Sequence, residues 1–580
     1  MLKIPYGESN FKKVITEGYF YQDRSEFIRE LEGYSSTSYM FYLRPRRFGK
    51  SLFVSMLHYY YGIEHKADFQ NLFGNLAIGK NPTEKANTYM VLAFEFSRIN
   101  TKTDETTFNG FLKNTKEGVY DFFEKYPTAF SKEIQEEVLA QKFPSEILQT
   151  LFTYYRSINV TTPLPKIYLI IDEYDHFANE LISFNYDFFS KSVATNGFVR
   201  KFYEVIKNAT FDGIVSKLFA TGVSPVTLDS MTSGFNITKN ISLQKVFHEM
   251  MGFTEEEVVG ILEKIGIQQA ELAAMLDNLR AWYDGYLFNP KAPRHLYNPD
   301  MVLFFAHSYQ SQNAYPQELL DPNIATDYSK IRNLFRIQDR EKENFTALKI
   351  LTEKGCITAE LTYQFSFERD FSQDDLISLL FYMGFLTIKE EDLGSFVFTF
   401  PNYVIEKLYT EYFVNMLRRS AELRTDNNEL AASLREIGRF GDPTNFYKQV
   451  ELILKALSNR DAQGFNEGSL KAIFVSLLHQ QKFYYVHSEY EAQRLYVDIF
   501  LEGIKGHAVI YEVAFELKYV KKSDKIDLEK ELDKAETQLL NYMETKKFNK
   551  RKSIKAFVVL VHGIELFSRE IFIKTMNDAN

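Results

Sequence analysis

The strongest constraint on the fold is a set of short, almost continuously apolar segments in the first 245 residues. Longer stretches with helical periodicity separate these segments. A strand that is apolar on both faces is buried on both, and strands joined by helices usually run parallel. The sequence therefore predicts an α/β fold with a parallel sheet covered on both faces, whose clearest strands are Tyr39–Leu43, Tyr89–Phe96, Ile167–Ile171 and Leu218–Thr221.

The chain of 580 residues is too long for one domain, so we expect three parts. These are a parallel-sheet domain over residues 1–250, a helical region over 251–425 and a second α/β domain over 446–580. From Phe253 the pattern is helical, beginning with a capping box at Thr254–Glu257. Residues 373–400 have the pattern of a helix followed by a two-stranded wing, which a winged helix would show. The polar stretch at residues 423–445 is the expected linker.

Composition excludes several classes of protein. The single cysteine, Cys356, leaves no disulfide scaffold and no multi-cysteine metal cluster, and it suits a reducing compartment. The formal net charge of −9 argues against non-specific coating of nucleic acid, although a local basic channel is compatible with it. No signal-peptide pattern is visible, and the longest nearly apolar run, residues 376–388, is shorter than a membrane span. We therefore expect a cytoplasmic protein without a membrane partner.

The segment Arg44–Ser51, RPRRFGKS, lies between a predicted strand and a predicted helix and ends like a phosphate-binding loop. Backbone N–H groups at such a helix start bind phosphate oxygens. Lys50 would reach the β- and γ-phosphates of ATP, and Ser51 would bind Mg²⁺. Because Arg44 replaces the first glycine of the motif, a basic helix cap without a nucleotide is the alternative. The candidate nucleotide-binding residues of this loop are Arg46, Arg47, Gly49, Lys50 and Ser51.

A second motif is the apolar strand that ends in Asp172 and Glu173. The carboxyl edge of a parallel sheet is where ligands bind, so these acids would lie near the phosphate loop. Asp172 would hold Mg²⁺, and Glu173 would polarise the attacking water. The alternative is an acidic strand end that merely caps a loop. Thr221, at the end of a further strand, is a candidate γ-phosphate sensor, although a plain turn would have the same pattern.

Together and in order, these motifs resemble the AAA-ATPase-like family of bacterial and archaeal proteins. The resemblance covers the chain to about residue 420 and includes IPxG, IDEYD, TGVS, GFTEEE and WYDGY segments, beginning at Ile4, Ile171, Thr221, Gly252 and Trp282. The family's YxDKT segment is matched at Tyr21 and Asp23, while Arg24 and Ser25 replace its last two residues. The resemblance implies a P-loop ATPase core with a helical lid. It also implies that the absence of the first glycine from the phosphate-binding loop is a feature of the family.

Near the C-terminus, two predicted strands carry acids and a lysine. Asp498 lies on the first strand, and Glu516 and Lys518 lie on the second. Alternation along a strand places Glu516 and Lys518 on one face, and a hairpin can bring Asp498 to them. Two carboxylates suit Mg²⁺ or Mn²⁺, and a lysine beside them can orient and polarise a water for attack on phosphorus. A surface ion pair between Glu516 and Lys518 is the alternative.

Two further residues bear on this site, although each alone is an ordinary surface residue. Glu467 begins a predicted helix ahead of the hairpin and could add a metal ligand, and Gln538 lies on the helix after the second strand. With an SExE stretch at Ser488–Glu491, residues 446–580 resemble the PD-(D/E)XK nuclease superfamily, in the branch commonly fused behind an AAA-ATPase-like domain. The resemblance implies a restriction-endonuclease-like domain, with metal-binding and catalytic positions at Asp498, Glu516 and Lys518 and supporting positions at Glu467 and Gln538.

The sequence leaves two functions open. The first is an ATP-regulated nuclease that uses Mg²⁺ or Mn²⁺ to hydrolyse phosphodiester bonds of DNA or RNA, with DNA the preferred expectation. The second is a nucleotide-dependent switch that binds nucleic acid or a partner without cutting it. A homo-oligomer is compatible with either. The basic stretch at residues 543–555 could contact phosphates, or it could be a solvated helix end.

Overall fold

The computed structural model separates into two compact units, each described here by itself. The first comprises Met1–Asn344 and Thr358–Tyr403, and the second comprises Phe345–Ile357 and Val404–Asn580. The three-part division expected from the sequence stays a prediction. The structure describes residues 2–34, 38–184, 186–193, 196–225, 238–316, 320–321, 341–365, 371–420, 427–457, 465–492, 495–504, 507–545, 548, 551 and 553–572.

The first unit is built on a parallel sheet, as predicted. Within the described residues its order is β2-β3-β4-β1-β5, and each neighbouring pair runs parallel. Every residue of β3 is buried, which explains why the strand is continuously apolar until its final acid. The strands are β1 (Tyr39–Leu43), β2 (Met90–Glu95), β3 (Ile167–Asp172), β4 (Val215–Gly222) and β5 (Lys239–Asn240).

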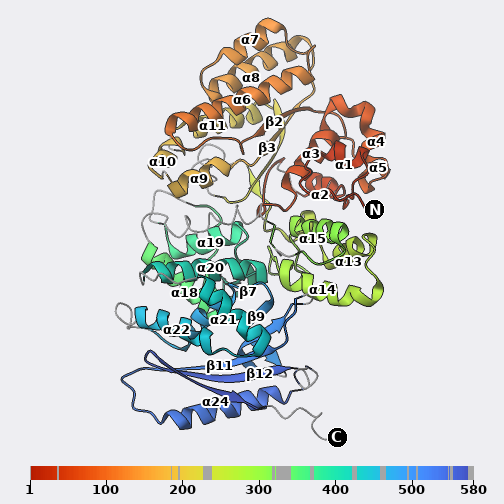
Figure 1. The fold of residues 1–580 in the computed structure, drawn as a ribbon. Coiled ribbons are helices and arrows are strands. Elements are labelled where there is room, and N and C mark those ends of the chain that lie inside the picture. Colours follow the sequence, from red (N-terminus) through yellow and green to blue (C-terminus); the bar gives the residue numbers. More distant parts are fainter. Residues whose placement is uncertain are drawn as a thin grey trace. The chain divides into compact units, whose positions relative to one another are not determined.

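Helices lie on both faces of this sheet (Figure 1), and different aromatic contacts attach them to it. On one face, Tyr61 of α3 (Lys50–Tyr61) lies 4.6 Å from Tyr168 of β3, between ring centroids. On the other face, Phe96 stacks on Phe111 of α6 (Asp104–Lys125) at 4.5 Å. Large aromatic side chains supply much of the buried area on both faces. The sheet is therefore covered on both sides, as its apolar strands require.

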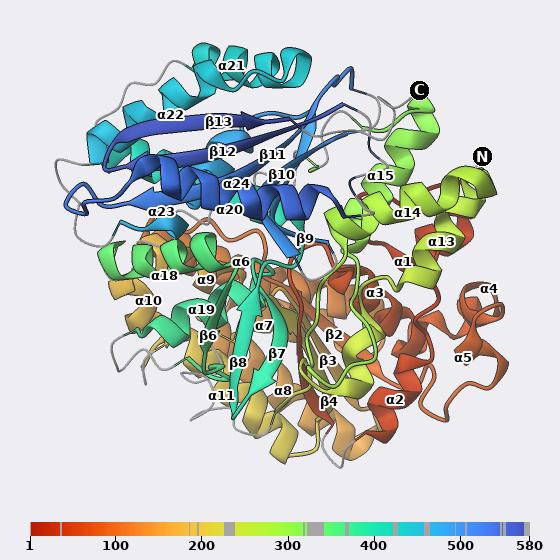
Figure 2. The same cartoon turned by 90° about the horizontal axis from the view of Figure 1, so that it is seen from below.

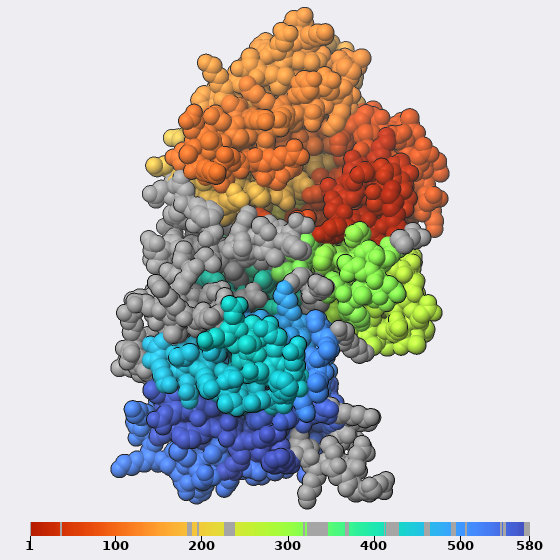
Figure 3. Space-filling model, viewed as in Figure 1, coloured from red at the N-terminus to blue at the C-terminus, as the bar shows by residue number. Residues whose placement is uncertain are grey.

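The other helices up to residue 250 pack around the parallel sheet of the first unit or around the helices that cover it. The residues of α6, α7 and α8, coloured orange, gather together (Figure 3), and the three helices contact one another. The other elements up to residue 250 are α1 (Phe11–Thr16), α2 (Phe27–Gly33), η1 (Ile63–Asp68), α4 (Phe69–Phe73), α5 (Ala77–Lys80), α7 (Lys132–Ala140), α8 (Pro144–Thr161), α9 (His176–Phe184), α10 (Tyr186–Val193), α11 (Phe198–Phe211) and η2 (Lys245–Met250).

After residue 250 the first unit becomes helical, as expected. The predicted capping box is present, because the Thr254 side chain accepts from Glu257 N and the Glu257 side chain accepts from Thr254 N. A helix and an antiparallel strand pair then follow within residues 373–400, joined by β6 in a sheet of order β6-β8-β7. The winged-helix interpretation stays a prediction. These elements are α13 (Glu255–Lys264), α14 (Gln269–Tyr283), α15 (Pro299–Gln312), α19 (Gln373–Tyr382), β7 (Thr387–Asp392) and β8 (Ser395–Thr399). Strand β6 (Cys356–Ala359) crosses the unit boundary, and only Thr358 and Ala359 belong to the first unit.

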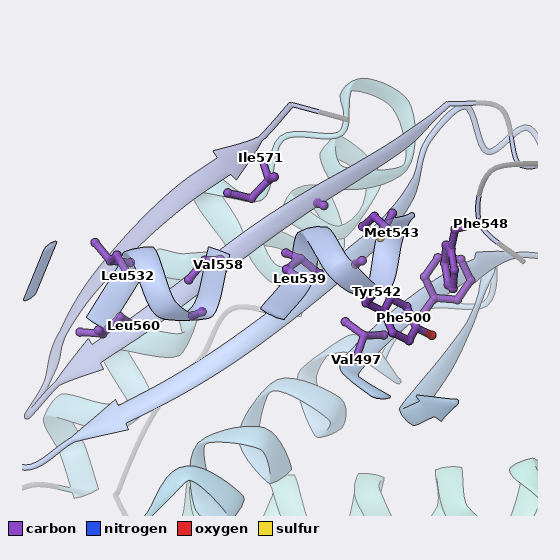
Figure 4. Close-up of a cluster of buried hydrophobic side chains, with 13 residues drawn as sticks. Val497, Phe500, Leu532, Leu539, Tyr542, Met543, Phe548, Val558, Leu560 and Ile571 are labelled. Atoms are coloured by element: carbon purple, nitrogen blue, oxygen red, sulfur yellow. The ribbon is translucent and has the colours of Figure 1, made fainter. Parts of the chain in front are cut away.

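The second unit contains a mixed sheet of order β13-β12-β11-β10-β9. The pair β11–β12 is parallel, and the other neighbouring pairs are antiparallel. Apolar side chains of α24 pack on one face, around Leu539 and Tyr542 (Figure 4). The strands and this helix are β9 (Tyr484–Ala492), β10 (Leu495–Gly503), β11 (Glu512–Val520), α24 (Leu528–Met543), β12 (Ile554–His562) and β13 (Glu565–Ile571).

Other helices of this unit cover the opposite face of the sheet (Figure 2). Phe474 of α23 lies 6.1 Å from Phe515 of β11, between ring centroids. Tyr447 of α22 lies 6.4 Å from the same ring. The helices besides α24 are α18 (Glu341–Lys354), α20 (Tyr403–Ser420), α21 (Asn427–Phe440), α22 (Thr444–Leu457) and α23 (Glu467–Leu478).

The linker expected at residues 423–445 is wrong over most of its length. Helix α21 occupies Asn427–Phe440, while residues 421–426 lie outside the described residues. Leu430, Leu434 and Ile437 are all buried. Their spacing of four and three residues forms a narrow apolar stripe on one helix face. The polar residues between them dominate the composition of the segment and hide this stripe.

Among the described residues, no helix combines the length and the apolar character needed to cross a membrane.

Candidate functional sites

The loop Arg44–Ser51 connects β1 to α3 and has the backbone of an anion-binding turn. Gly49 precedes α3 with a φ of +92°, a left-handed conformation that glycine adopts without strain. Within the described residues, no side-chain hydrogen bond caps the N-terminus of α3. The N–H groups of its first turn are therefore available to an anion.

Lys50 is buried within this loop. Its Nζ donates to the carbonyl oxygens of Arg44 at 3.0 Å and Pro45 at 3.1 Å. Burial lowers the pKa of Lys50, while the charges of Glu173 and Asp172 act in the opposite direction. The lysine is thus held at the loop by two neutral carbonyl acceptors, which a phosphate anion could replace.

Arg44, at the position of the absent glycine, has a structural role. Its side chain is 1% exposed, and it donates to the carbonyl oxygens of Ser242 at 2.7 Å and Phe247 at 3.1 Å. The guanidinium also lies 4.0 Å from the ring centroid of Phe288. Burial lowers the pKa of Arg44 to about 10. Arg44 therefore fastens the end of β1 to a segment 200 residues away in sequence rather than capping α3.

The acid pair at the end of β3 lies beside the loop. Asp172 is buried, and its Oδ1 accepts from Thr221 Oγ1 at 2.5 Å and from Glu173 N at 3.0 Å. Burial raises the pKa of Asp172, whereas hydrogen bonds from Ser51 and Thr221 lower it. The structure thus brings together two sequence-predicted magnesium ligands, Ser51 and Asp172. Thr221 contacts the carboxylate, and its role as a γ-phosphate sensor stays a prediction.

Glu173 is kept anionic by its neighbours. Burial raises its pKa, but the hydrogen bond with His176 and the charge of Lys50 outweigh burial and lower the pKa to about 2. His176 Nδ1 lies 3.1 Å from Glu173 Oε2 and 3.5 Å from an amino nitrogen of Arg46. Sequence reasoning missed His176. Its position three residues after a candidate acid, at the start of α9, was the available signal.

A cavity of about 430 Å³ lies over this loop. The cavity is lined by loop residues from Arg46 to Phe53, including Arg47, and by Glu173 and His176. Apolar residues from four other segments complete it, among them Pro5, Tyr21, Met251, Phe253 and Leu303. A charged end beside an apolar wall suits a nucleoside triphosphate, and the volume is typical of ligand sites.

Arg24 joins two segments of the cavity wall. Its guanidinium donates to both carboxylate oxygens of Glu257, at 2.5 and 2.7 Å, and to the Gly252 carbonyl at 2.7 Å. Both side chains are mostly buried, at 14% and 16% exposed. A planar, bidentate pair of this kind holds its partners in one orientation. Arg24, one of the departures from the family segment, therefore stabilises the wall.

The second site lies where β10 and β11 separate. Their backbone pairing runs from Leu501–Val513 to Ile499–Phe515. One residue further, Asp498 Oδ2 accepts from Leu517 N at 2.8 Å, so a side chain takes the place of a backbone acceptor. Lys518 Nζ lies 3.2 Å from Glu516 Oε1 and 3.5 Å from Glu467 Oε1. The structure therefore brings Asp498, Glu516, Lys518 and Glu467 together.

Charge and burial at this site favour a cation. Burial raises the pKa of Glu516 to about 7, and the charge of Asp498 adds to the rise while Lys518 opposes it. Burial lowers the pKa of Lys518, but Glu516 and Glu467 outweigh it and the net direction is upward. A buried carboxylate beside a second carboxylate is poorly stable as an anion without added positive charge. The donor set, all carboxylate oxygens, therefore fits Mg²⁺ or Mn²⁺.

Two other residues of this domain bear on the expected site. Gln538 lies exposed on α24, and none of the hydrogen bonds or ion pairs of the described residues joins it to the acidic cluster. Its supporting role stays a prediction. Lys471, which sequence reasoning missed, is buried with its Nζ 3.7 Å from Asp498 Oδ1. It follows Glu467 by one helical turn on α23, which was the available signal.

The described part of the basic stretch at residues 543–555 is engaged within the fold. Arg551 lies 2.8 Å from a Glu512 oxygen and 2.6 Å from a Glu502 oxygen, and Lys555 lies 3.1 Å from Glu570. These two cations therefore neutralise acids of the sheet. The remaining basic residues, at positions 546, 547, 550 and 552, lie outside the described residues, as do the side chains at 489–491 of the SExE stretch.

The fold and the two sites define a protein that joins a P-loop-type parallel-sheet domain to a nuclease-like domain. Comparison with known proteins agrees. Residues 5–232 match the family described as "Predicted AAA-ATPase", and residues 465–570 match the PD-(D/E)XK nuclease superfamily. The chain therefore contains an AAA-ATPase-like domain and a C-terminal PD-(D/E)XK nuclease superfamily domain.

One curated relative resembles most of the chain. An uncharacterized protein in the vnfD 5′ region of Azotobacter chroococcum mcd 1 is 24% identical over 486 residues, which cover 82% of this chain and 78% of the relative. The similarity thus extends across both compact units rather than over one alone.

Proposed function

We propose that the protein is an ATP-regulated, divalent-metal-dependent nuclease that cleaves phosphodiester bonds, with DNA preferred over RNA. The observation that carries this proposal is the cluster in which Glu516 and Glu467 lie within 3.5 Å of the Lys518 ammonium group, while the charge of Asp498 acts on Glu516. A merely structural ion pair between Glu516 and Lys518 would not require a second, half-buried acid, Asp498, whose charge disfavours the ionised form of Glu516. The nuclease superfamily match supports the same reading.

Each residue of this cluster has a distinct part in the proposed reaction. Asp498 and Glu516, with Glu467 beside them, would hold Mg²⁺ or Mn²⁺. When bound, such an ion stabilises negative charge on phosphoryl oxygens and makes water more acidic. Lys518 would orient the attacking water and donate to a phosphate oxygen. Hydrolysis adds the water oxygen to phosphorus, breaks one P–O ester bond and passes a proton to the departing oxygen.

The nucleotide part of the proposal rests on the cavity over the loop at residues 44–51. Lys50, Gly49, Arg46 and Arg47 would bind the phosphates of ATP, and Ser51 with Asp172 would hold its Mg²⁺. Glu173, anionic and hydrogen-bonded to His176, would orient a water at the γ-phosphate. Nucleotide state in this domain would then regulate cleavage by the other.

The test uses the purified full chain with single- and double-stranded DNA and RNA, Mg²⁺ or Mn²⁺, and ATP or no nucleotide. Asp498→Asn and Lys518→Met should each reduce cleavage at least about a hundredfold while circular dichroism stays unchanged. Lys521→Met is the matched control, because Lys521 is an exposed lysine in the turn after β11. Cleavage by Asp498→Asn at the wild-type rate, or no cleavage by the wild type with any substrate, would sink the proposal.

ATP regulation is tested separately with Lys50→Met. This variant should lose the difference between cleavage with and without ATP while keeping the metal dependence. If wild-type cleavage is indifferent to ATP, the regulatory part is wrong and the nuclease part stands. If nucleic acid binds in a Lys50-dependent manner but is never cut, the protein is instead a nucleotide-dependent binding switch.

A further inference from the structure

A separate group of metal-ligand side chains lies at the C-terminal end of α3, the helix that begins at the phosphate loop. His58 is in the last turn of α3, and Glu64 and His65 follow on η1. One ligand atom from each of the three residues lies within 4.8 Å of the other two. Neither the ATPase-like nor the nuclease-like chemistry uses these residues.

Two of the three distances between the candidate ligand atoms are close to those of a tetrahedral metal site. His58 Nε2 lies 3.2 Å and His65 Nε2 lies 3.5 Å from the same oxygen, Glu64 Oε1. Zinc bonds of about 2.05 Å in tetrahedral geometry place ligand atoms about 3.3 Å apart. Octahedral geometry at similar bond lengths would place adjacent ligands about 3.0 Å apart, which fits less well.

Other elements hold the Glu64 carboxylate in place. Its second oxygen, Oε2, accepts from the Tyr126 hydroxyl at 2.7 Å. That hydroxyl in turn accepts from the backbone N–H of Val91, on β2, at 2.7 Å. Outer hydrogen bonds that orient a carboxylate ligand are typical of built metal sites. With Oε2 held in this way, the other oxygen of Glu64, Oε1, faces the imidazoles of His58 and His65.

Burial and access are also compatible with a metal ion. Burial lowers the pKa of both His58 and His65, which favours the neutral imidazole that binds metals. The charged groups acting on the two imidazoles are Glu64, Asp121, Lys125 and Lys12. The three candidate ligand side chains are 15–21% exposed, so a water molecule can reach the group as a fourth ligand.

We propose that His58, Glu64 and His65 bind one Zn²⁺ ion, with water as the fourth ligand, in a structural site. Two imidazoles and a carboxylate suit a borderline transition metal better than Mg²⁺. The ion would tie the end of α3 to η1 and, through Tyr126, to β2. This proposal does not depend on either proposed catalytic activity.

Hydrogen bonds from both imidazoles to one carboxylate oxygen would give similar distances without any metal, and the experiment separates the two cases. The full chain is stripped with a chelator and titrated with Zn²⁺ in excess Mg²⁺. Wild type should bind one more equivalent of Zn²⁺ than His65→Ala or Glu64→Gln. Any Zn²⁺ taken up at the acidic cluster of the second unit is common to all variants and cancels in the difference.

Cobalt substitution supplies the second readout. Co²⁺ in a four-coordinate site gives intense visible absorption, whereas six-coordinate Co²⁺ does not. The intense bands should appear in wild type and in the control His295→Ala, which alters an exposed histidine of the same unit, and not in His65→Ala. The emission of buried Trp282 confirms that each variant folds. Equal Zn²⁺ uptake by wild type and His65→Ala, or weak cobalt bands in the wild type, would overturn the proposal.

Discussion

At the scale of single residues, two cations of the same loop have different roles because their acceptors differ. Arg44 donates to carbonyl groups near residues 242–248, so removing it would detach a remote segment. Lys50 donates only to carbonyls of its own loop in the described hydrogen bonds, and a phosphate can replace these acceptors. Burial alone does not distinguish the two side chains, since both are nearly inaccessible.

We predict that Lys50→Met lowers the affinity for ATP or ADP by about 10- to 150-fold. A charge-assisted hydrogen bond contributes about 1.5–3 kcal/mol, and each 1.4 kcal/mol is a factor of ten. Titration with a fluorescent ADP analogue measures the change. Lys113→Met, which alters an exposed lysine on α6, is the control and should bind like wild type. Unchanged affinity in Lys50→Met would contradict a phosphate-binding role.

We also predict an acid-dependent loss of stability that originates at His248. This side chain is 1% exposed, its Nε2 donates to the Arg294 carbonyl at 3.0 Å, and its Nδ1 has no hydrogen-bond partner among the described residues. Burial lowers its pKa to about 3, and the charge of Arg44 adds to the shift. Because the unfolded chain takes up the proton first, stability falls as the pH drops from about 6.5 toward 3.

The His248 contribution should be about 1.4 kcal/mol between pH 7.5 and pH 5.5. Urea denaturation followed by Trp282 emission measures it, since Trp282 is the single tryptophan of the chain and is buried in the first unit. His248→Gln should have a pH dependence smaller by this amount. An identical pH dependence in the variant and wild type would show that other groups titrate instead.

At the scale of elements, amphipathic helices complete both faces of the mixed sheet. On α24, Leu532, Ala535, Leu539 and Tyr542 are buried against the strands, at spacings of three and four residues (Figure 4). Exposed polar residues alternate with them. Helix α21 is also amphipathic, but its apolar stripe has only three buried residues, Leu430, Leu434 and Ile437. Because so few of its residues are apolar, the composition of the segment predicted a linker there.

We predict that Leu539→Ala destabilises the second unit by about 2–5 kcal/mol, since it removes a buried side chain from a closely packed cluster. Far-ultraviolet circular dichroism during denaturation measures the change. Thr537→Ala, at an exposed position of the same helix, should change stability by less than about 0.5 kcal/mol. Equal effects of the two substitutions would mean that α24 does not pack as described.

At the scale of the whole molecule, the chain enters the second unit, returns to the first and enters the second again. The boundaries fall after residues 344, 357 and 403. Residues 345–357 are therefore part of the second unit, where Ser469 Oγ donates to Glu353 Oε1 at 2.6 Å. The nuclease superfamily match, at residues 465–570, includes the five strands of the sheet up to residue 570. It does not include the helices α18, α20, α21 and α22 of the same unit.

We predict two unfolding transitions that respond to different ligands. ADP should move the transition reported by Trp282, and Mn²⁺ without nucleotide should move a second transition seen by circular dichroism. A ligand at about 100 times its Kd stabilises its own unit by about 2.7 kcal/mol. Coincident transitions that shift together with either ligand would show that the two units unfold as one.

The sequence by itself determined four of the five described strands of the parallel sheet, all but β5, together with the capping box at Thr254 and the positions of both motif sets. These depend on neighbours within one element, where periodicity, caps and burial on two faces leave a local pattern. Only the tertiary structure decided the insertion of β4 between β1 and β3, the anchoring role of Arg44, the approach of Lys471 to Asp498 and the grouping of His58, Glu64 and His65 with Tyr126. Each of these depends on contacts between elements far apart in the chain, and no local period encodes which distant partner a side chain meets.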